Sequence, residues 1–122
     1  MIQGLKERIF GTPELRGVRD LAKRLGGRVY TNKSGSVLDV PYPSALTPEG
    51  AYQLVGRAAG PFANLEGTPD NGVIRNGHGN VACTVSALYG KLTIGSPPGT
   101  EGILPFYMSV LGKLIAYPDR AE

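Results

Sequence analysis

The sequence predicts an α+β domain that is mainly helical, with one short antiparallel hairpin near its N-terminus. Three observations predict this fold class. Apolar residues recur at helical spacing in several segments, one pair of β-favouring runs flanks a turn, and 122 residues can bury one modest core. We therefore expect residues 1–122 to form a single domain, with a basic part at 1–46 and a helical region at 47–122.

The composition limits the chemistry that the chain can carry. Apolar residues make up 41% of the chain, which argues against disorder, and 18 glycines with 10 prolines indicate many loops. A single cysteine excludes an internal disulfide, and together with one histidine it falls short of a zinc ligand set. We expect no bound metal and no cofactor.

Neither a secretory signal nor a membrane span is predicted. The N-terminal ten residues carry three charges and no long apolar stretch. The longest apolar run, residues 103–117, is interrupted by Pro105, Gly112 and Lys113 and is too short to cross a bilayer. We expect a cytoplasmic or virion-associated protein.

Two helices are predicted before the hairpin. Residues 2–10 carry apolar side chains at helical spacing. A second helix begins after Thr12, which can cap free N–H groups, with Pro13 in its first turn, and it ends at the glycine pair 26–27. Its apolar stripe consists of Leu15, Val18, Leu21, Ala22 and Leu25.

The next elements are a hairpin and a well-marked helix. Residues 28–31 and 37–40 favour strands, and the segment between them is rich in turn formers. A third helix follows, with Thr47 as its cap and Gly60 at its end. Residues 61–80 are expected to form a long loop, and loops of that length are often functional.

The segment after this loop is ambiguous, because residues 81–92 fit both a strand alternation and a helical stripe. Asn80 as a cap, together with Ala82 and Leu88, favours a helix over residues 80–90. A final helix is predicted from Leu104 to Ile115, since its apolar residues recur every three or four positions.

If a helix begins at Asn80, then Cys83 lies in its first turn. Free N–H groups and the helix dipole favour a thiolate there, and the thiolate is the nucleophilic form. Asn76, Gly79 and Asn80 would then supply polar groups to bind the substrate or an oxyanion. His78 is a weaker candidate for the general base, because a residue between two glycines is as readily an exposed turn tip.

The stretch "GNVACTVSALYGKL" resembles the nucleophile helix of papain-like cell-wall hydrolases and phage cysteine peptidases, the NlpC-type and CHAP-type group. The matching residues are Cys83, Thr84, Val85, Ser86 and Leu88, and the likeness extends over residues 47–115. It implies the helical half of a papain-like fold, with Cys83 attacking an amide such as a peptidoglycan peptide bond. In that group the catalytic histidine follows the cysteine, whereas here no histidine does. The resemblance therefore implies that a second chain or a missing C-terminal segment supplies it, or that the chain is an inactive relative.

Positive charge is concentrated near the N-terminus. Eight of the 13 lysines and arginines precede residue 34, and Arg16, Arg19 and Lys23 form one stripe of the second predicted helix. Such a stripe suits an anion, whether peptidoglycan, another anionic polymer or nucleic acid.

Three functions follow. The first is a cysteine hydrolase or its inactive relative. The second is a non-catalytic structural or assembly protein, such as an oligomeric phage virion or tail component. The third is a nucleic-acid binder that uses the basic N-terminal helices.

Overall fold

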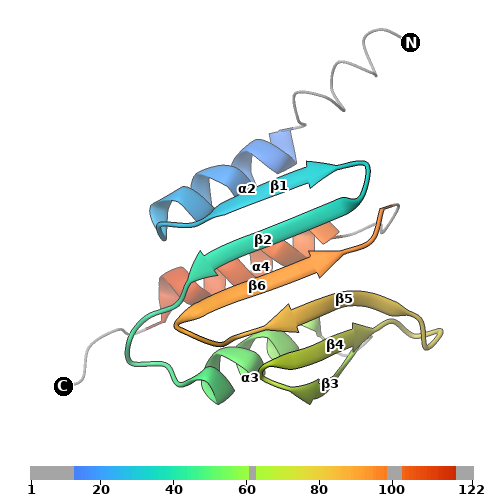
Figure 1. Cartoon of the computed structure of the whole chain (residues 1–122). Coiled ribbons are helices and arrows are strands. Elements are labelled where there is room, and N and C mark those ends of the chain that lie inside the picture. Colours follow the sequence, from blue (N-terminus) through green and yellow to red (C-terminus); the bar gives the residue numbers. More distant parts are fainter. Residues whose placement is uncertain (1–12, 61–62, 99–102, 118–122) are drawn as a thin grey trace, which may run out of the picture.

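A six-stranded antiparallel sheet with helices packed on one of its faces forms the described part of the chain (Figure 1). The computed structural model describes residues 13–60, 63–98 and 103–117. Its elements, in chain order, are α2 (Pro13–Arg24), β1 (Arg28–Asn32), β2 (Gly35–Pro41), α3 (Pro48–Ala59), β3 (Asn64–Thr68), β4 (Asn71–Arg75), β5 (Val81–Ser86), β6 (Lys91–Ser96) and α4 (Ile103–Ala116). The predicted helix at 2–10 and the cap Thr12 lie outside these residues.

The strand order is β1-β2-β6-β5-β4-β3, with every neighbouring pair antiparallel. The pairing of β2 with β6 joins the N-terminal hairpin to the four-strand meander that follows α3. Val40 lies opposite Leu92 in this pairing, and neither has any solvent exposure. Residues 1–46 and 47–122 therefore contribute to one continuous sheet.

Helix α2 forms as the sequence predicts, and its C-terminus is closed by a glycine motif. The Gly26 N–H donates to the Lys23 carbonyl at 2.9 Å, and the Gly27 N–H donates to the Ala22 carbonyl at 2.8 Å. Gly26 has φ +85°, which glycine adopts without strain. The inward face of α2 buries Leu15, Val18 and Ala22.

Helices α3 and α4 also confirm their predicted segments. Thr47 Oγ1 accepts a hydrogen bond from the Gly50 N–H at 3.0 Å and so caps α3. Helix α4 packs against both α2 and α3. The Tyr107 hydroxyl on α4 donates to the Ile94 carbonyl of β6 at 3.0 Å, so this buried polar group is satisfied.

The predicted fold class, mainly helical with one short hairpin, is wrong. The segment 80–90 is not a helix: it contains β5 and the turn after it, and β6 follows. Alternation decides this, because Cys83 and Val85 face the core at 2% and 3% exposure. Val81 and Tyr89, which both the strand alternation and the helical stripe would place on the buried face, are instead 42% and 93% exposed.

The predicted loop over residues 61–80 is wrong as well, since it contains the hairpin of β3 and β4. Pro69 and Asp70, which are both common turn residues, connect the paired residues Thr68 and Asn71. Leu65 pairs with Ile74 across this hairpin. The strands are short and their flanking residues polar, so their local pattern resembled that of a loop.

The sheet face opposite the helices is uncovered in the described part of the chain (Figure 1). Its central residues are small or polar, among them Val37, Thr84, Thr93 and Gly95. In the same part of the chain, no helix has both the length and the apolar character that a bilayer crossing needs. The uncovered face is therefore a mixed, mostly polar surface.

Tyr89→Gly distinguishes the strand from the predicted helix. Tyr89 has φ +60°, a conformation that is strained for any residue except glycine. Glycine at this position should therefore raise the free energy of unfolding by up to about 1 kcal/mol. The buried neighbour Val85 serves as the reference, since Val85→Ala should lower it by about 2 kcal/mol. Urea unfolding measures both. If Tyr89→Gly instead lowered the free energy of unfolding by about 1 kcal/mol or more, the result would favour the helix predicted for residues 80–90.

Candidate functional site

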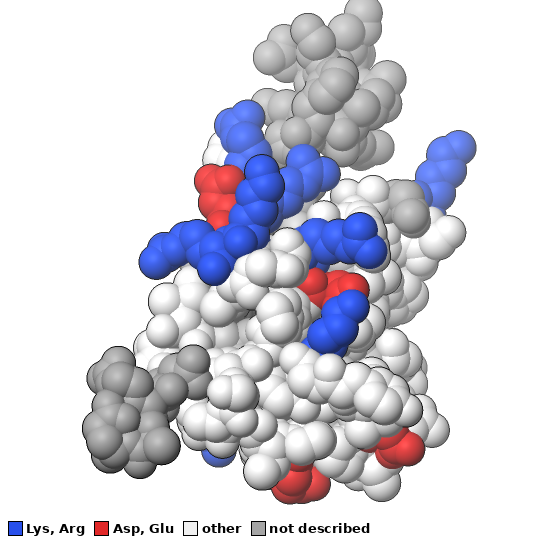
Figure 2. All heavy atoms as spheres, turned by 60° about the vertical axis from the view of Figure 1, so that its left-hand side comes forward, with Lys and Arg blue, Asp and Glu red and all other residues white. Residues whose placement is uncertain are grey.

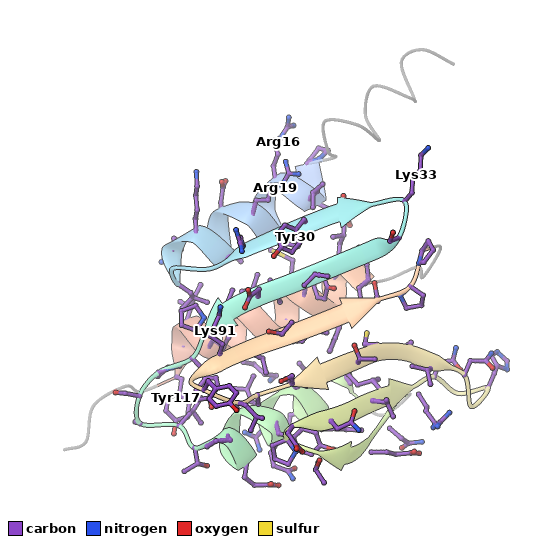
Figure 3. All side chains as sticks on the ribbon, viewed as in Figure 1. Arg16, Arg19, Tyr30, Lys33, Lys91 and Tyr117 are labelled. Atoms are coloured by element: carbon purple, nitrogen blue, oxygen red, sulfur yellow. The ribbon has the colours of Figure 1, made fainter. Side chains whose placement is uncertain are left out.

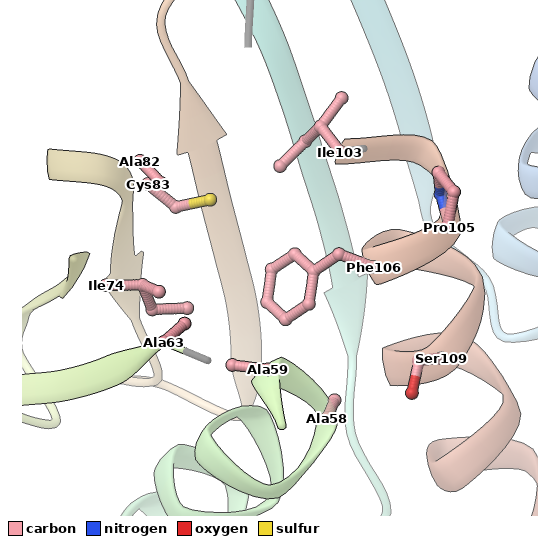
Figure 4. Close-up of a pocket in the computed structure, with 10 residues that line it drawn as sticks. All are labelled: Ala58, Ala59, Ala63, Ile74, Ala82, Cys83, Ile103, Pro105, Phe106 and Ser109. Atoms are coloured by element: carbon pink, nitrogen blue, oxygen red, sulfur yellow. The ribbon is translucent and has the colours of Figure 1, made fainter. Parts of the chain in front are cut away.

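Cys83 faces the helices from β5 and lines an apolar cavity of about 350 Å³ (Figure 4). Its sulfur points toward α4, and only 2% of the residue is exposed. The cavity is enclosed by residues of α3, β4, β5 and α4 together with Ala63. They are Ala58, Ala59, Ala63, Ile74, Ala82, Cys83, Ile103, Pro105, Phe106 and Ser109.

The surroundings of Cys83 favour the neutral thiol. Burial raises the pKa of this thiol from its ordinary 9.0 to about 12. The strand also gives the sulfur no helix N-terminus, so the electrostatic argument for a thiolate is lost. The expectation of a cysteine hydrolase stays an untested prediction, and the geometry at Cys83 adds nothing in its favour.

The predicted site residues Asn76, His78, Gly79 and Asn80 lie in the turn between β4 and β5. Asn76 Oδ1 accepts hydrogen bonds from the His78 N–H at 2.9 Å and from the Asn80 N–H at 3.1 Å. Gly79, with φ +83°, donates its N–H to the Asn76 carbonyl at 3.0 Å. The carbonyl of Gly79 in turn accepts from Arg75 Nη1 at 3.0 Å. These groups hold the hairpin turn together.

His78 and Cys83 thus occupy different environments. His78 is exposed at the tip of the turn, whereas the Cys83 thiol points into the cavity between the sheet and the helices. The Asn80 N–H already donates a hydrogen bond to the side chain of Asn76, so this N–H is not free to bind an oxyanion as the sequence predicts. The structure does not bring the predicted nucleophile and base into one site.

The predicted basic stripe does form a surface. Arg16, Arg19 and Lys23 are exposed side chains of α2. Figure 3 shows Arg16 and Arg19 on this helix, beside the β1 edge of the sheet. With Arg28 of β1 they line a hollow of about 320 Å³, which we call the basic groove. Its lining residues are Arg16, Arg19, Asp20, Lys23, Gly27, Arg28 and Val29. Figure 2 shows lysine and arginine gathered over this side of the molecule.

No carboxylate among the described residues forms a salt bridge with the cations of the basic groove. In residues 13–60, 63–98 and 103–117, salt bridges are formed by Arg75 with Glu66 at 3.0 Å and by Lys91 with Asp39 at 3.5 Å. Asp20 is the carboxylate that lines the groove, against four cationic side chains. The groove therefore carries an excess of positive charge exposed to solvent.

Sequence reasoning missed Arg28, Lys91 and Tyr30. A second hollow, of about 310 Å³, is lined by both Arg28 and Lys91, so Arg28 borders two hollows. The Arg28 guanidinium also lies 5.1 Å from the centre of the Tyr30 ring. The alternation of side chains along β1 could have identified Arg28 and Tyr30. Because Val29 is buried, its two neighbours share the opposite face of the strand.

Within the described residues, no group of three or more His, Cys, Asp or Glu side chains is placed to hold a metal ion. Comparison with known proteins adds no assignment, since no family model, no curated protein and no solved structure matches the chain.

We expect Cys83 to resist Ellman's reagent in the folded protein at neutral pH and to react promptly in urea, because the thiol is buried and protonated. The control is Thr84→Cys in a Cys83→Ala background, since Thr84 is the exposed neighbour on the same strand. Native Cys83 labelling as fast as that control would contradict the buried thiol and favour the nucleophile hypothesis.

The raised pKa also sets a pH dependence. The neutral Cys83 thiol contributes to the free energy of unfolding. This contribution is fully present below the ordinary pKa of 9.0 and is lost as the pH rises through the folded-state pKa of about 12.

Proposed function

We propose that this chain is a non-catalytic domain that binds nucleic acid by its phosphate backbone, through the basic groove. The observation that carries the proposal is the set of four cationic side chains that share one hollow with a single carboxylate. Exposed cations without carboxylate partners keep their charge available for phosphates. This function is the third of those that the sequence suggests, now attached to a defined surface.

The spacing of the cations along α2 suits a row of phosphates. Arg16, Arg19 and Lys23 follow one another at three and four residues, so they lie on one helix face. At 1.5 Å per residue the stripe is about 10 Å long, so its three side chains can reach neighbouring phosphates along one strand. Arg28, on the neighbouring strand, widens the stripe toward the sheet.

Arginine is well suited to this task. Its guanidinium presents a fork of donors that can hold a phosphate with two hydrogen bonds, whereas lysine acts as a point charge. Three of the four groove cations are arginines. The nearby carboxylate of Asp39 is engaged by Lys91 at 3.5 Å and accepts a hydrogen bond from Thr93 at 3.4 Å. Although Asp39 lies opposite Arg28 in the pairing of β1 with β2, no salt bridge joins these two residues.

A second candidate function is assembly into oligomers, as expected of a structural protein. Among the described strands, β1 pairs only with β2, and β3 pairs only with β4, so the sheet has two open edges. The basic groove borders the β1 edge, while Glu66 and Asp70 lie at the β3 edge. Although Glu66 is already paired with Arg75 at 3.0 Å, the difference in charge between the two edges favours contact between copies in a head-to-tail arrangement.

Binding to a labelled oligonucleotide should be steeply salt-dependent. Neutralising Arg16, Arg19 and Lys23 together to Ala should weaken binding at every sequence and reduce the salt slope by about three, since each lost phosphate contact removes about one. Fluorescence anisotropy across a salt series measures both quantities.

Arg57→Ala is the matched control, because Arg57 is an exposed arginine of α3 outside the basic groove. It should leave both affinity and slope unchanged. Binding that ignores salt, or that Arg57→Ala weakens as much as the triple variant, would contradict the proposal. Peptidoglycan fragments and heparin, added as competitors, separate nucleic acid from other anionic polymers.

The assembly candidate has its own test in sedimentation equilibrium at low salt. Head-to-tail contact predicts a mass that grows with concentration and falls when Glu66 and Asp70 are replaced by lysine, since both edges would then be basic. A constant monomer mass over the whole concentration range would dismiss this candidate and leave the nucleic-acid proposal intact.

A further inference from the structure

Tyr30 is a large aromatic side chain that the fold leaves exposed in the middle of β1. Val29 faces the core at 6% exposure, and alternation places Tyr30 on the uncovered face of the sheet at 40%. Figure 3 shows the ring in front of β1, with no helix on that side. No helix of the described residues covers Tyr30, although the Arg28 guanidinium lies over its ring, so the exposed part of the side chain is what a ligand can contact.

The neighbours of Tyr30 form a low surface around the ring. Val37 lies opposite Tyr30 on β2, and the residue opposite Val37 on β6 is Gly95, which has no side chain. Beyond it on β5 stands Thr84, opposite Gly95. The ring therefore stands at the margin of a shallow platform, where a flat group can approach it.

Cations flank Tyr30 along its own strand. Arg28 precedes it by two residues, and its guanidinium lies 5.1 Å from the ring centre. Lys33 follows in the exposed turn after β1. At about 3.3 Å per residue, the backbone of Arg28 lies about 7 Å from that of Tyr30 along the strand. This interleaving of positive charge with an aromatic ring is typical of surfaces that bind single strands.

Arg28 connects this platform to the basic groove. It lines the groove together with the three cations of α2, and it also contacts the ring of Tyr30. A strand whose phosphates lie along α2 can therefore pass Arg28 and place its next base over β1. The acidic groups nearest this path are Asp20 in the groove and Asp39, which is held by Lys91.

We propose that the preferred ligand is single-stranded nucleic acid, with one unpaired base stacked on Tyr30 while Arg28 and the α2 cations hold the adjoining phosphates. The inference rests on the proposed function and specifies its substrate class. In a duplex the base faces are covered by their neighbours, so only a single strand offers a face to the ring. Stacking of this kind tolerates any base, which suits a site with one aromatic ring.

The test compares two labelled strands of about 15 nucleotides, one of thymidines and one of the same length without bases, so that their phosphate charges match. The wild-type protein should bind the thymidine strand about five- to a hundredfold more tightly than the abasic strand. Tyr30→Thr keeps a β-favouring residue and should abolish that difference. Tyr30→Phe keeps the ring and should preserve it. Thermal unfolding checks that both variants are folded.

A crosslink provides an independent measurement. A strand that carries 5-iodouracil should photo-crosslink to Tyr30, and mass spectrometry of the wild-type complex identifies the residue without any variant. Crosslinks found only at other residues would overturn the stacking proposal.

The outcomes separate the two proposals. If both strands bind with equal, salt-sensitive affinity and Tyr30→Thr changes nothing, the stacking site is wrong and phosphate binding stands. The same holds if Tyr30→Thr weakens both strands equally, or if a duplex of matched length binds more tightly than the thymidine strand. If no strand binds in a salt-sensitive manner, the proposed function itself fails.

Discussion

The burial of one face of the sheet under α2, α3 and α4 is the constraint from which the rest of this structure follows. At its centre β2 pairs with β6, and the inward residues Leu38, Val40, Leu92 and Ile94 have no solvent exposure. Because Tyr107 is buried, its hydroxyl needs a hydrogen-bond partner, which the Ile94 carbonyl provides. Burial also favours the protonated form of the Cys83 thiol. Chemistry that needs a charged sulfur is therefore disfavoured where the fold places the only cysteine.

That constraint also produces the basic groove. Leu15, Val18 and Ala22 must face the sheet, so α2 is rotated in a way that turns its cationic stripe outward. Gly26 and Gly27 then reverse the direction of the chain, and β1 runs back beside α2. Gly27 allows this close return, because a Cβ there would lie 2.4 Å from the Asp39 carbonyl oxygen. The apolar packing of α2 against the sheet therefore determines that its cationic side chains lie on the exposed side of the helix.

Elements with strong local signals were predictable from the sequence, and elements that depend on distant partners were not. The cap at Thr47 and the glycine stop after α2 are interactions within a few residues, so the helix boundaries could be read directly. Residues 81–92 fitted two periodicities equally well. Their choice of strand depends on Ile74 and Ile94, which pair with Cys83 and Val85 from other parts of the chain. The periodicity within residues 81–92 alone carries no information about those partners.

The candidate site likewise contains some residues that the local sequence predicts and others that only the tertiary structure reveals. By itself the sequence determined that Arg16, Arg19 and Lys23 share one helix face, because that depends only on the helical period. Only the tertiary structure decided that Arg28 and Tyr30 complete the surface, since strand β1 lies beside α2 and turns both side chains outward. It also decided that Cys83 and His78 lie apart, one in the core and one at a turn. Local periodicity specifies which residues share a face, whereas the pairing of strands distant in sequence specifies which faces meet.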